Sequence, residues 1–309
     1  MIEVRHLRKQ YDGKVAIANL NLSIPAGEVY GLIGPNGAGK TTLIRILATL
    51  LEPTYGQVTI GGIDVCERPL DVHPLIGYMS DFFSLYDDML VWEYLDHFAG
   101  CYRIERSRRK QLIDDVLELV SLEVRRDDKI KALSRGMRQR LCFAKTLLHQ
   151  PQVLLLDEPA SGLDPAGRIE FREILKKLHE MGRTVLISSH ILTEMADFCT
   201  SIGIVEQGQL LASGRVEDIL RQLQSRMRLV IEVADGQTLQ LAQLLEQEVA
   251  AEKVDHSNGQ LTCTWGGSRD ELPALHRRIV NQGIPLVSFS IERDNLEDIY
   301  MHISGHRTS

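Results

Sequence analysis

One glycine-rich turn constrains this chain more than any other segment. Residues 34–41 are GPNGAGKT, which fits the pattern G-x-x-x-x-G-K-[ST]. An apolar run, 29–33, precedes the turn, and a helix with Leu43, Leu47 and Leu50 on one face follows it. Strand, glycine-rich turn and helix in this order form an anion site, because backbone N–H groups and the positive helix end converge there. The segment predicts an α/β fold with a phosphate-binding turn, hereafter the phosphate loop (34–41).

Each residue type in the phosphate loop has a defined role in binding phosphate or Mg²⁺. Glycines let the backbone close around phosphate oxygens, Lys40 reaches the β- and γ-phosphates, and the Thr41 hydroxyl ligates Mg²⁺. A chance match to the pattern is on the order of a percent per chain, and the flanking strand and helix lower that further. We therefore expect ATP or a related nucleotide to be bound by Gly34, Pro35, Asn36, Gly37, Ala38, Gly39, Lys40, Thr41 and Thr42.

A second segment, QVLLLDEP at 152–159, supplies acidic groups. Its continuous apolar run is typical of a buried parallel strand, and ligands of open α/β sheets bind beyond the carboxyl ends of such strands. We expect Asp157 to hold Mg²⁺ through its water shell and Glu158 to polarise the water that attacks the γ-phosphate. A solvated acidic pair that only ends the strand is the minor alternative.

A third apolar strand, TVLISS, ends just before His190. The same edge rule places His190 near the γ-phosphate, where a neutral imidazole can orient water or sense the phosphate. An isolated histidine after a strand is more often a surface residue. The functional interpretation therefore depends on the two other strands.

The pattern of elements predicts two domains. Through about residue 215, short apolar strands alternate with helical periods, except for a helical insertion at about 82–150. A bridging helix, SGRVEDILRQLQSRM, leads to a region with the order β-α-β-β-α-β and a closing helix, NLEDIYMHI. We predict an α/β domain at 1–217 and a small α+β, ferredoxin-like domain at 218–309.

Composition limits the class of function. The chain has 35 basic and 42 acidic residues, a net charge of −7, which argues against non-specific nucleic-acid binding. No run approaches the roughly 18 apolar residues that a spanning helix needs, and the N-terminus lacks the pattern of a cleaved signal. We expect a chain located in the cytoplasm.

Four motifs in order carry a family resemblance. With GPNGAGKTT, LSRGMRQR, VLLLDEPASGLD and SSH, the chain resembles the nucleotide-binding subunit of ATP-binding-cassette (ABC) transporters over about residues 1–215. The resemblance implies a P-loop NTPase cassette that hydrolyses ATP with Mg²⁺. It also implies that Tyr11 stacks on adenine, and that Asp157, Glu158 and His190 take the metal, water-polarising and switch roles argued above.

The resemblance further implies a head-to-tail dimer. Ser134 and Gly136 lie in the segment that contacts ATP held by the opposite subunit, and the loop ending at Asp164 links the two sites. Both Ser134 and Asp164 also precede helical runs, so each is equally explained as a helix N-cap. The two roles can coexist.

Two motifs depart from the family pattern. The usual LSGGQ is Leu-Ser-Arg-Gly-Met at 133–137, so Arg135 replaces a glycine and Met137 a glutamine. The glutamine expected after the IGYM strand is replaced by Asp81, which can face the Mg²⁺ shell but cannot donate a hydrogen bond as glutamine does. Arg135 is expected either to add positive charge toward phosphate or to face solvent.

Three functions compete. The first is the ATPase subunit of an ABC transporter on the inner face of the cell membrane, paired with a separately encoded transmembrane permease and a second, identical cassette. The tail SFSIERDNLEDIYMHI is similar to tails of exporter cassettes.

The second is an ABC-type ATPase acting on ribosomes or nucleic-acid machinery, which the single phosphate loop and acidic balance disfavour. The third, a non-hydrolytic switch, does not need Glu158. We predict an exporter subunit.

Overall fold

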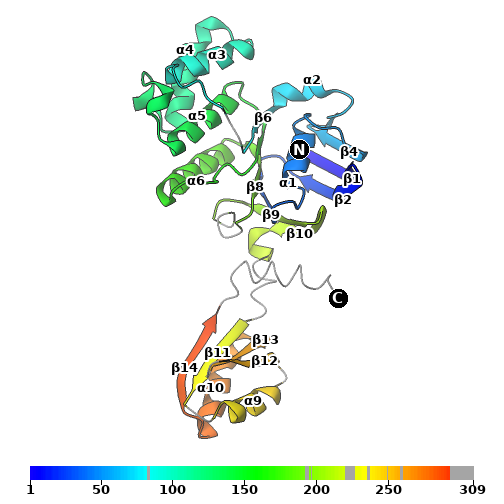
Figure 1. Ribbon diagram of the computed structural model, residues 1–309, viewed down its shortest axis with the longest axis vertical. Coiled ribbons are helices and arrows are strands. Elements are labelled where there is room, and N and C mark those ends of the chain that lie inside the picture. The colour runs from blue at the N-terminus through cyan, green and yellow to red at the C-terminus, as the bar shows by residue number, and fades with distance from the viewer. Residues whose placement is uncertain are drawn as a thin grey trace. The chain divides into compact units, whose positions relative to one another are not determined.

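The computed structural model describes residues 1–81, 84–191, 195, 197–219, 227–234, 237–248, 250–257 and 260–292. The chain divides into two compact units, Met1–Val216 and Glu217–Ser309. Figure 1 shows two described sheets in the first unit and one in the second.

The first unit contains an antiparallel sheet and a largely parallel sheet. The antiparallel sheet has the order β2-β1-β4-β5, and the larger sheet has the order β10-β9-β3-β8-β7-β6. In the larger sheet, only the β10–β9 pair is antiparallel among the described pairings. The strands are β1 (Ile2–Tyr11), β2 (Lys14–Ile24), β3 (Val29–Ile33), β4 (Tyr55–Ile60), β5 (Ile63–Asp64), β6 (Ile76–Met79), β7 (Val153–Leu156), β8 (Thr184–Ser189), β9 (Ser201–Glu206) and β10 (Gln209–Arg215).

Helices cover the larger sheet and form a lobe between β6 and β7. They are α1 (Lys40–Leu47), α2 (Pro69–Val72), α3 (Val91–Cys101), α4 (Arg106–Leu119), α5 (Arg135–Leu147) and α6 (Pro165–Glu180), with 3-10 turns η1 (His73–Leu75), η2 (Glu123–Arg125) and η3 (Ile130–Ala132). Figure 1 shows α1 and α6 on opposite sides of β8, and α3, α4 and α5 gathered away from β1 and β2.

The central parallel strands are buried on both faces of the sheet. Every residue of β3, β7 and β8 is buried, because helices cover both faces of the sheet. On one face, Leu43 and Leu47 of α1 join the same apolar core as Leu155 of β7. On the other, α6 buries an apolar stripe that includes Phe171 and Leu175.

The helix ends follow local chemistry. Asp164 accepts a hydrogen bond from Gly167 N at 2.9 Å, and Pro165 occupies the first position of α6, where a missing N–H costs nothing. Glu93 in the first turn of α3 accepts a hydrogen bond from Leu90 N at 2.9 Å. Gly182, with φ of +73°, follows α6.

The second unit has its own core. Its elements are β11 (Met227–Val233), α9 (Thr238–Glu246), β12 (Ala251–Ser257), β13 (Gln260–Trp265), η4 (Arg269–Glu271), α10 (Leu272–Asn281) and β14 (Leu286–Glu292). The strands form an antiparallel sheet of order β12-β13-β11-β14. Leu261, Cys263 and Trp265 of β13 point into one core together with Leu241 of α9 and Leu275 of α10.

Several sequence-based details are corrected. Helix α1 ends at Leu47, and Leu50, predicted on its apolar face, is 62% exposed. The predicted bridging helix began at Ser213, yet 213–215 belong to β10, where Ser213 pairs with Gly203. Of the rest of that helix, 216–219 are helical and Met227 begins β11, while 220–226 lie outside the described residues, as does the predicted closing helix at 295–303.

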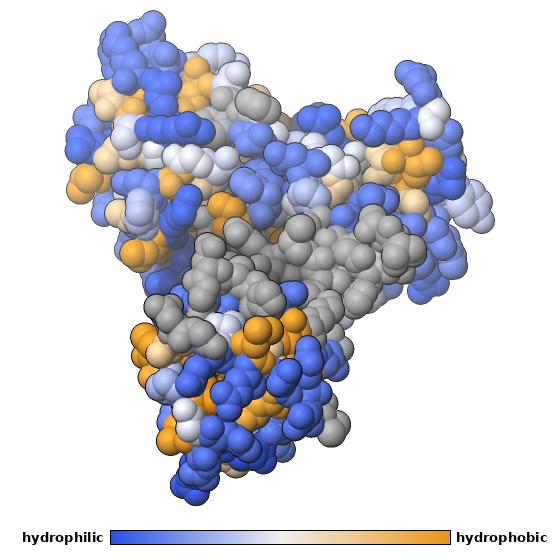
Figure 2. Space-filling model, turned by 60° about the horizontal axis from the view of Figure 1, so that its bottom comes forward, coloured by the Kyte–Doolittle hydropathy of each residue, from blue (hydrophilic) through white to orange (hydrophobic). Residues whose placement is uncertain are grey.

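Within the described ranges, no helix is both long and apolar enough to cross a membrane. Figure 2 shows apolar residues interspersed with hydrophilic ones on the visible surface of the second unit. Exposed apolar side chains of that unit include Leu239, Val280 and Val287.

The packing of α6 on α5 gives a prediction. Phe171 of α6 is 2% exposed, and its ring centroid lies 5.4 Å from that of Phe143 in α5. Phe171→Ala should lower the free energy of unfolding of the first unit by about 3–5 kcal/mol, because truncation leaves a cavity. Ile169→Ala, on the exposed side of the same helix, should change it by less than about 0.5 kcal/mol.

Tryptophan fluorescence can follow this unit alone. The chain has two tryptophans, Trp92 and Trp265, and only Trp92 lies in the first unit. Denaturant unfolding of both variants in a Trp265→Phe background therefore reports the first unit. Equal midpoints for Phe171→Ala and Ile169→Ala would contradict the described packing.

Candidate functional site

Three neighbouring strands bring the predicted site residues together. Strand β8 pairs in parallel with β3 on one side and with β7 on the other. Their carboxyl ends therefore meet at one edge, where β3 leads into the phosphate loop, β7 into Asp157 and β8 into His190. Gly34 N donates a hydrogen bond to Ser189 O at 3.3 Å, which ties the loop to the end of β8.

Backbone packing fixes the shape of the phosphate loop. A Cβ atom on Gly34 would lie 2.1 Å from Val205 O, and one on Gly39 would lie 2.5 Å from Ala16 O. Gly39 also has φ of +105°, which side-chain-bearing residues rarely adopt. The turn between β9 and β10 braces the loop, because Gly208 N donates to Ala38 O at 3.0 Å. Glycine is therefore required at both loop positions by close backbone approach.

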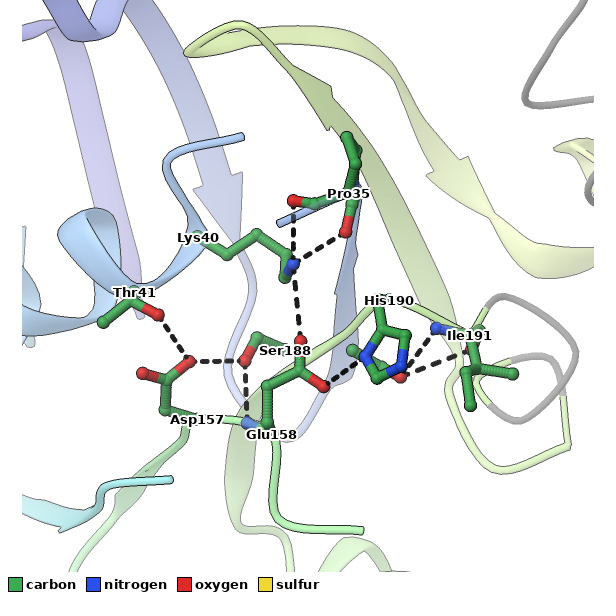
Figure 3. A network of polar contacts seen from close by, with 10 residues as sticks. Pro35, Lys40, Thr41, Asp157, Glu158, Ser188, His190 and Ile191 are labelled. Carbon is green, nitrogen blue, oxygen red and sulfur yellow. Dashed lines mark hydrogen bonds and ion pairs between the residues drawn. The ribbon is translucent and has the colours of Figure 1, made fainter. Parts of the chain in front are cut away.

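Lys40 is held by the loop and by one acid. It is only 5% exposed, and its Nζ donates to Gly34 O at 2.6 Å and to Pro35 O at 3.2 Å. The same Nζ lies 3.4 Å from Glu158 Oε1. A buried ammonium needs such partners, because removal from water without them is costly. Figure 3 shows the Lys40 side chain pointing between the loop carbonyls and Glu158.

Asp157 and Glu158 lie in different environments. Asp157 is 2% exposed, and its Oδ1 accepts hydrogen bonds from Thr41 Oγ1 at 3.2 Å and Ser188 Oγ at 2.7 Å. Glu158 Oε2 lies 2.8 Å from His190 Nδ1 (Figure 3). Its other oxygen, Oε1, is buried without a hydrogen-bond partner, apart from the nearby Lys40 charge. Asp157 is thus held beside Thr41, whereas Glu158 Oε1 has the Lys40 charge nearby but no hydrogen-bond donor.

Ser188 is a site residue that the sequence interpretation missed. Its hydroxyl donates to Asp157 and accepts from Glu158 N at 2.9 Å, so one side chain positions both acids. Glu158 has φ of +48°, a left-handed conformation that is strained for a residue with a side chain. The pair of buried serines that ends this strand, after the apolar residues 185–187, was the available signal.

Asp81 lies at the same sheet edge. Strand β6 pairs in parallel with β7, and Met79 is opposite Leu156. The residues that follow β6 therefore lie beside Asp157 and Glu158, which follow β7. Burial raises the pKa of the Asp81 carboxyl, and the charges of Asp157 and Glu158 raise it further, while Arg135 and His190 lower it. Asp81 therefore follows β6 near the end of β7 where the two acids lie.

Helices α5 and α6 start beside the loop that follows Glu158. Ser134 caps α5, accepting from Met137 N at 3.3 Å, and Asp164 caps α6 as described above. Gln139 of α5 is buried and its Nε2 donates to Pro159 O, a contact that sequence interpretation did not foresee. Both capping roles considered for Ser134 and Asp164 are present, and Gly136 lies in the first turn of α5.

Tyr11 lies apart from this network. It ends β1, is 42% exposed, and has the Lys9 ammonium 5.0 Å from its ring centroid. Among the described contacts none joins Tyr11 to Lys40 or to Asp157. Strand β2, the partner of β1, reaches the phosphate loop at Ala16, beside Gly39.

Comparison with known proteins identifies the family. Residues 17–161 match the family model described as ABC transporter. The chain is 36% identical over 306 residues to the uncharacterized ABC transporter ATP-binding protein YhcH of Bacillus subtilis, covering 99% of this chain and 96% of that one. The chain belongs to the ATP-binding proteins of ABC transporters.

A second relative and a solved structure agree with this assignment. The linearmycin resistance ATP-binding protein LnrL of Bacillus subtilis is 29% identical, with 99% of this chain and 98% of that protein covered. The dimeric structure of a post-hydrolysis state of the ATP-binding cassette MJ0796 bound to ADP and Pi is 26% identical, with a TM-score of 0.63 over 70% of this chain and 99% of that one.

The predicted cassette fold and ATPase activity are thereby confirmed. The chain is an ATP-binding cassette of the P-loop NTPase fold, and it is the ATP-hydrolysing subunit of a transporter. The ribosome or nucleic-acid alternative is not favoured, and neither is a switch without hydrolysis.

The Ser188 contacts give a prediction for this cassette. Ser188→Ala should lower kcat for ATP at least about tenfold, because loss of one anchoring hydrogen bond to each acid costs on the order of 1–3 kcal/mol. KM for ATP should change much less, since the phosphate loop and Lys40 are untouched. Steady-state ATPase assays measure both constants.

The neighbouring serine offers a matched control. Ser189 Oγ bonds only to Ile191 backbone atoms among the described contacts, at 3.0 and 3.5 Å. Ser189→Ala should therefore retain most of the turnover. Equal kcat values for the two variants would show that Ser188 does not position the acids.

Proposed function

We propose that this cassette is the ATPase subunit of an efflux pump, held on the cytoplasmic face of the cell membrane by a separately encoded permease. The observation that supports export is the similarity to the linearmycin resistance protein, which extends over both units of the chain and not only the cassette. The tail resemblance noted in the sequence favours the same class. Transported substrates would then be contacted by the permease.

ATP phosphates would bind in the phosphate loop. Lys40 at present bonds to two neutral carbonyl oxygens, and phosphate oxygens are stronger, charged acceptors for an ammonium group. The first N–H groups of α1 have no acceptor within the helix and face the loop. We assign phosphate binding to 34–42 and adenine stacking to Tyr11, the aromatic residue that ends β1.

The donor set fits Mg²⁺. Thr41 Oγ1 and Asp157 Oδ1 lie 3.2 Å apart, and a hydroxyl with one carboxylate suits an ion that takes its remaining ligands from water and substrate phosphates. Within the described ranges, no cluster of three or more His, Cys, Asp or Glu side chains is arranged to hold a metal. Bound Mg²⁺ would neutralise phosphate charge, with Asp81 as a neighbouring acid.

Glu158 is the residue best placed to polarise water. Its Oε1 has no hydrogen-bond partner, while Oε2 is held by His190 at 2.8 Å. Oε1 lies 3.4 Å from Lys40 Nζ. Once the ammonium turns toward ATP phosphates, this oxygen can accept a proton from an attacking water. We assign catalysis to Glu158 and the orienting role to His190.

A second copy of the chain completes the proposal. Ser134 and Gly136 stand at the N-terminal end of α5, where backbone N–H groups attract anions, and Asp164 begins α6. In a head-to-tail dimer the start of α5 would face ATP held by the opposite copy. Hydrolysis would then reopen the dimer and move the attached permease.

Substitution of Glu158 tests the dimer. Glu158→Gln should bind ATP but lose turnover at least about 100-fold, because a general base contributes roughly that factor. The stalled variant should elute as a dimer in Mg-ATP during size-exclusion chromatography with light scattering. Lys40→Ala, which removes the phosphate contact, should stay monomeric and bind nucleotide weakly. A monomeric Glu158→Gln chain in excess Mg-ATP would count against a homodimer.

Affinity purification from detergent-solubilised native membranes tests the transport assignment. The tagged chain should retain a multi-helix membrane protein at a fixed ratio, and mass spectrometry would identify it. Recovery with ribosomal proteins, or without any membrane protein, would favour the ribosome or nucleic-acid alternative. Lys40→Ala, which should bind nucleotide weakly, is the control that shows whether retention of the membrane protein depends on bound nucleotide.

A further inference from the structure

The turn between α3 and α4 carries a cluster of exposed cations. Residues 103–110 contain five basic side chains and one acid, Glu105. Arg109 is partly buried and lies 3.6 Å from Asp96. Within the part of the chain that the structure describes, no hydrogen bond or ion pair reaches the other four basic side chains, all of which are exposed. Figure 1 shows α3 and α4 at the outer end of the helical lobe. These four residues form the basic tip: Arg103, Arg106, Arg108 and Lys110.

Helix α4 carries its charges at the ends that the helix dipole disfavours. Acidic side chains stabilise the start of a helix and basic side chains its end. In α4 the first turn has no acid and the last turn has no base. Arg106 instead occupies the first position, four residues from Lys110, and like charges at this spacing repel. Glu105 precedes the helix without capping it, and its carboxylate accepts a hydrogen bond from Ser107 Oγ at 2.7 Å.

Arg103 stands at a position where glycine is usual. Helix α3 closes with hydrogen bonds from Arg103 N to Gly100 O and from Ile104 N to Ala99 O, each 3.0 Å long. This closure places Arg103 in a left-handed conformation, with φ of +58°, which glycine adopts most easily. The backbone at Arg103 and the first turn of α4 thus favour other residue types. Such local conflicts are expected where a sequence serves binding rather than folding.

An anionic lipid surface fits the basic tip. Arginine and lysine have apolar stems and charged ends, which suit the boundary between acyl chains and headgroups. Tyr102 adds an aromatic ring beside the tip, because it is 40% exposed and its ring centroid lies 4.3 Å from that of His149. Tyrosine is enriched at membrane interfaces. Nucleic acid also presents phosphates, but the net charge of −7 disfavours binding of an extended polyanion.

We propose that the basic tip binds anionic lipid headgroups, so that the chain contacts the membrane surface through its own side chains. Each arginine or lysine near an anionic surface raises partitioning onto it roughly fivefold, and salt screens this attraction. The contact goes beyond the attachment by a permease proposed above and does not depend on it. It gives the unfavourable charges of α4 a role that folding does not explain.

Sedimentation of the full chain with lipid vesicles tests the basic tip. At low salt, the chain should partition at least about tenfold more strongly onto vesicles of about 40% phosphatidylglycerol in phosphatidylcholine than onto pure phosphatidylcholine. Added salt should reduce this preference, because it screens the charges. Arg106→Gln combined with Arg108→Gln should weaken binding to the anionic vesicles at least about tenfold, since two contributions of roughly fivefold multiply.

A second double variant is the matched control. Arg5 and Arg8 are exposed on β1, which lies away from the helical lobe (Figure 1). Arg5→Gln combined with Arg8→Gln changes the net charge by the same amount and should bind the anionic vesicles within about twofold of wild type. Equal losses in the two double variants, or no preference of the wild type for anionic vesicles, would overturn the proposal.

Stability and competition measurements separate the lipid contact from other roles. The denaturant midpoint of the Arg106→Gln and Arg108→Gln double variant should equal or exceed that of wild type, because cations are removed from the start of α4. A lower midpoint would make these arginines structural and contradict the proposal. Tighter binding to a short DNA duplex than to vesicles of equal accessible phosphate would assign the tip to nucleic acid instead. The vesicles contain no permease, so failure here is distinguishable from failure of the affinity purification.

Discussion

The parallel pairing of β3, β8 and β7 is the constraint on which the rest of the site depends. Parallel strands have their carboxyl ends at one edge of the sheet. The phosphate loop, the acidic pair and His190 therefore lie close together, although they are far apart in the sequence. Helices on both faces keep these strands buried and in register. The buried strands therefore fix the positions at which the short site loops begin.

Within that edge, charge is balanced by a few buried contacts. Lys40 is enclosed by loop carbonyls and Glu158, and Asp157 is enclosed by the Thr41 and Ser188 hydroxyls. Each buried ionic group thus has partners before any ligand binds, which lowers the cost of holding charge away from water. Ser188 matters most for geometry, because one hydroxyl contacts both acids.

The lobe made by α3, α4 and α5 connects to this edge through side chains. Gln139 donates to Pro159 O, and the Arg135 guanidinium covers Gly162, so α5 contacts the loop after Glu158 at two points. The ring pair of Phe143 and Phe171 joins α5 to α6. A displacement of this lobe would therefore move the loop that follows Glu158.

Sequence patterns were sufficient to predict the cassette fold and the candidate phosphate, metal and water-polarising residues. Those features depend on residue types at fixed spacing next to recognisable strands. Spacing does not encode that Ser188 bridges the two acids, that Leu50 lies outside the core, or that Arg135 packs on Gly162. These facts arise between segments far apart in the chain, and only packing of the strands and helices brings such segments into contact.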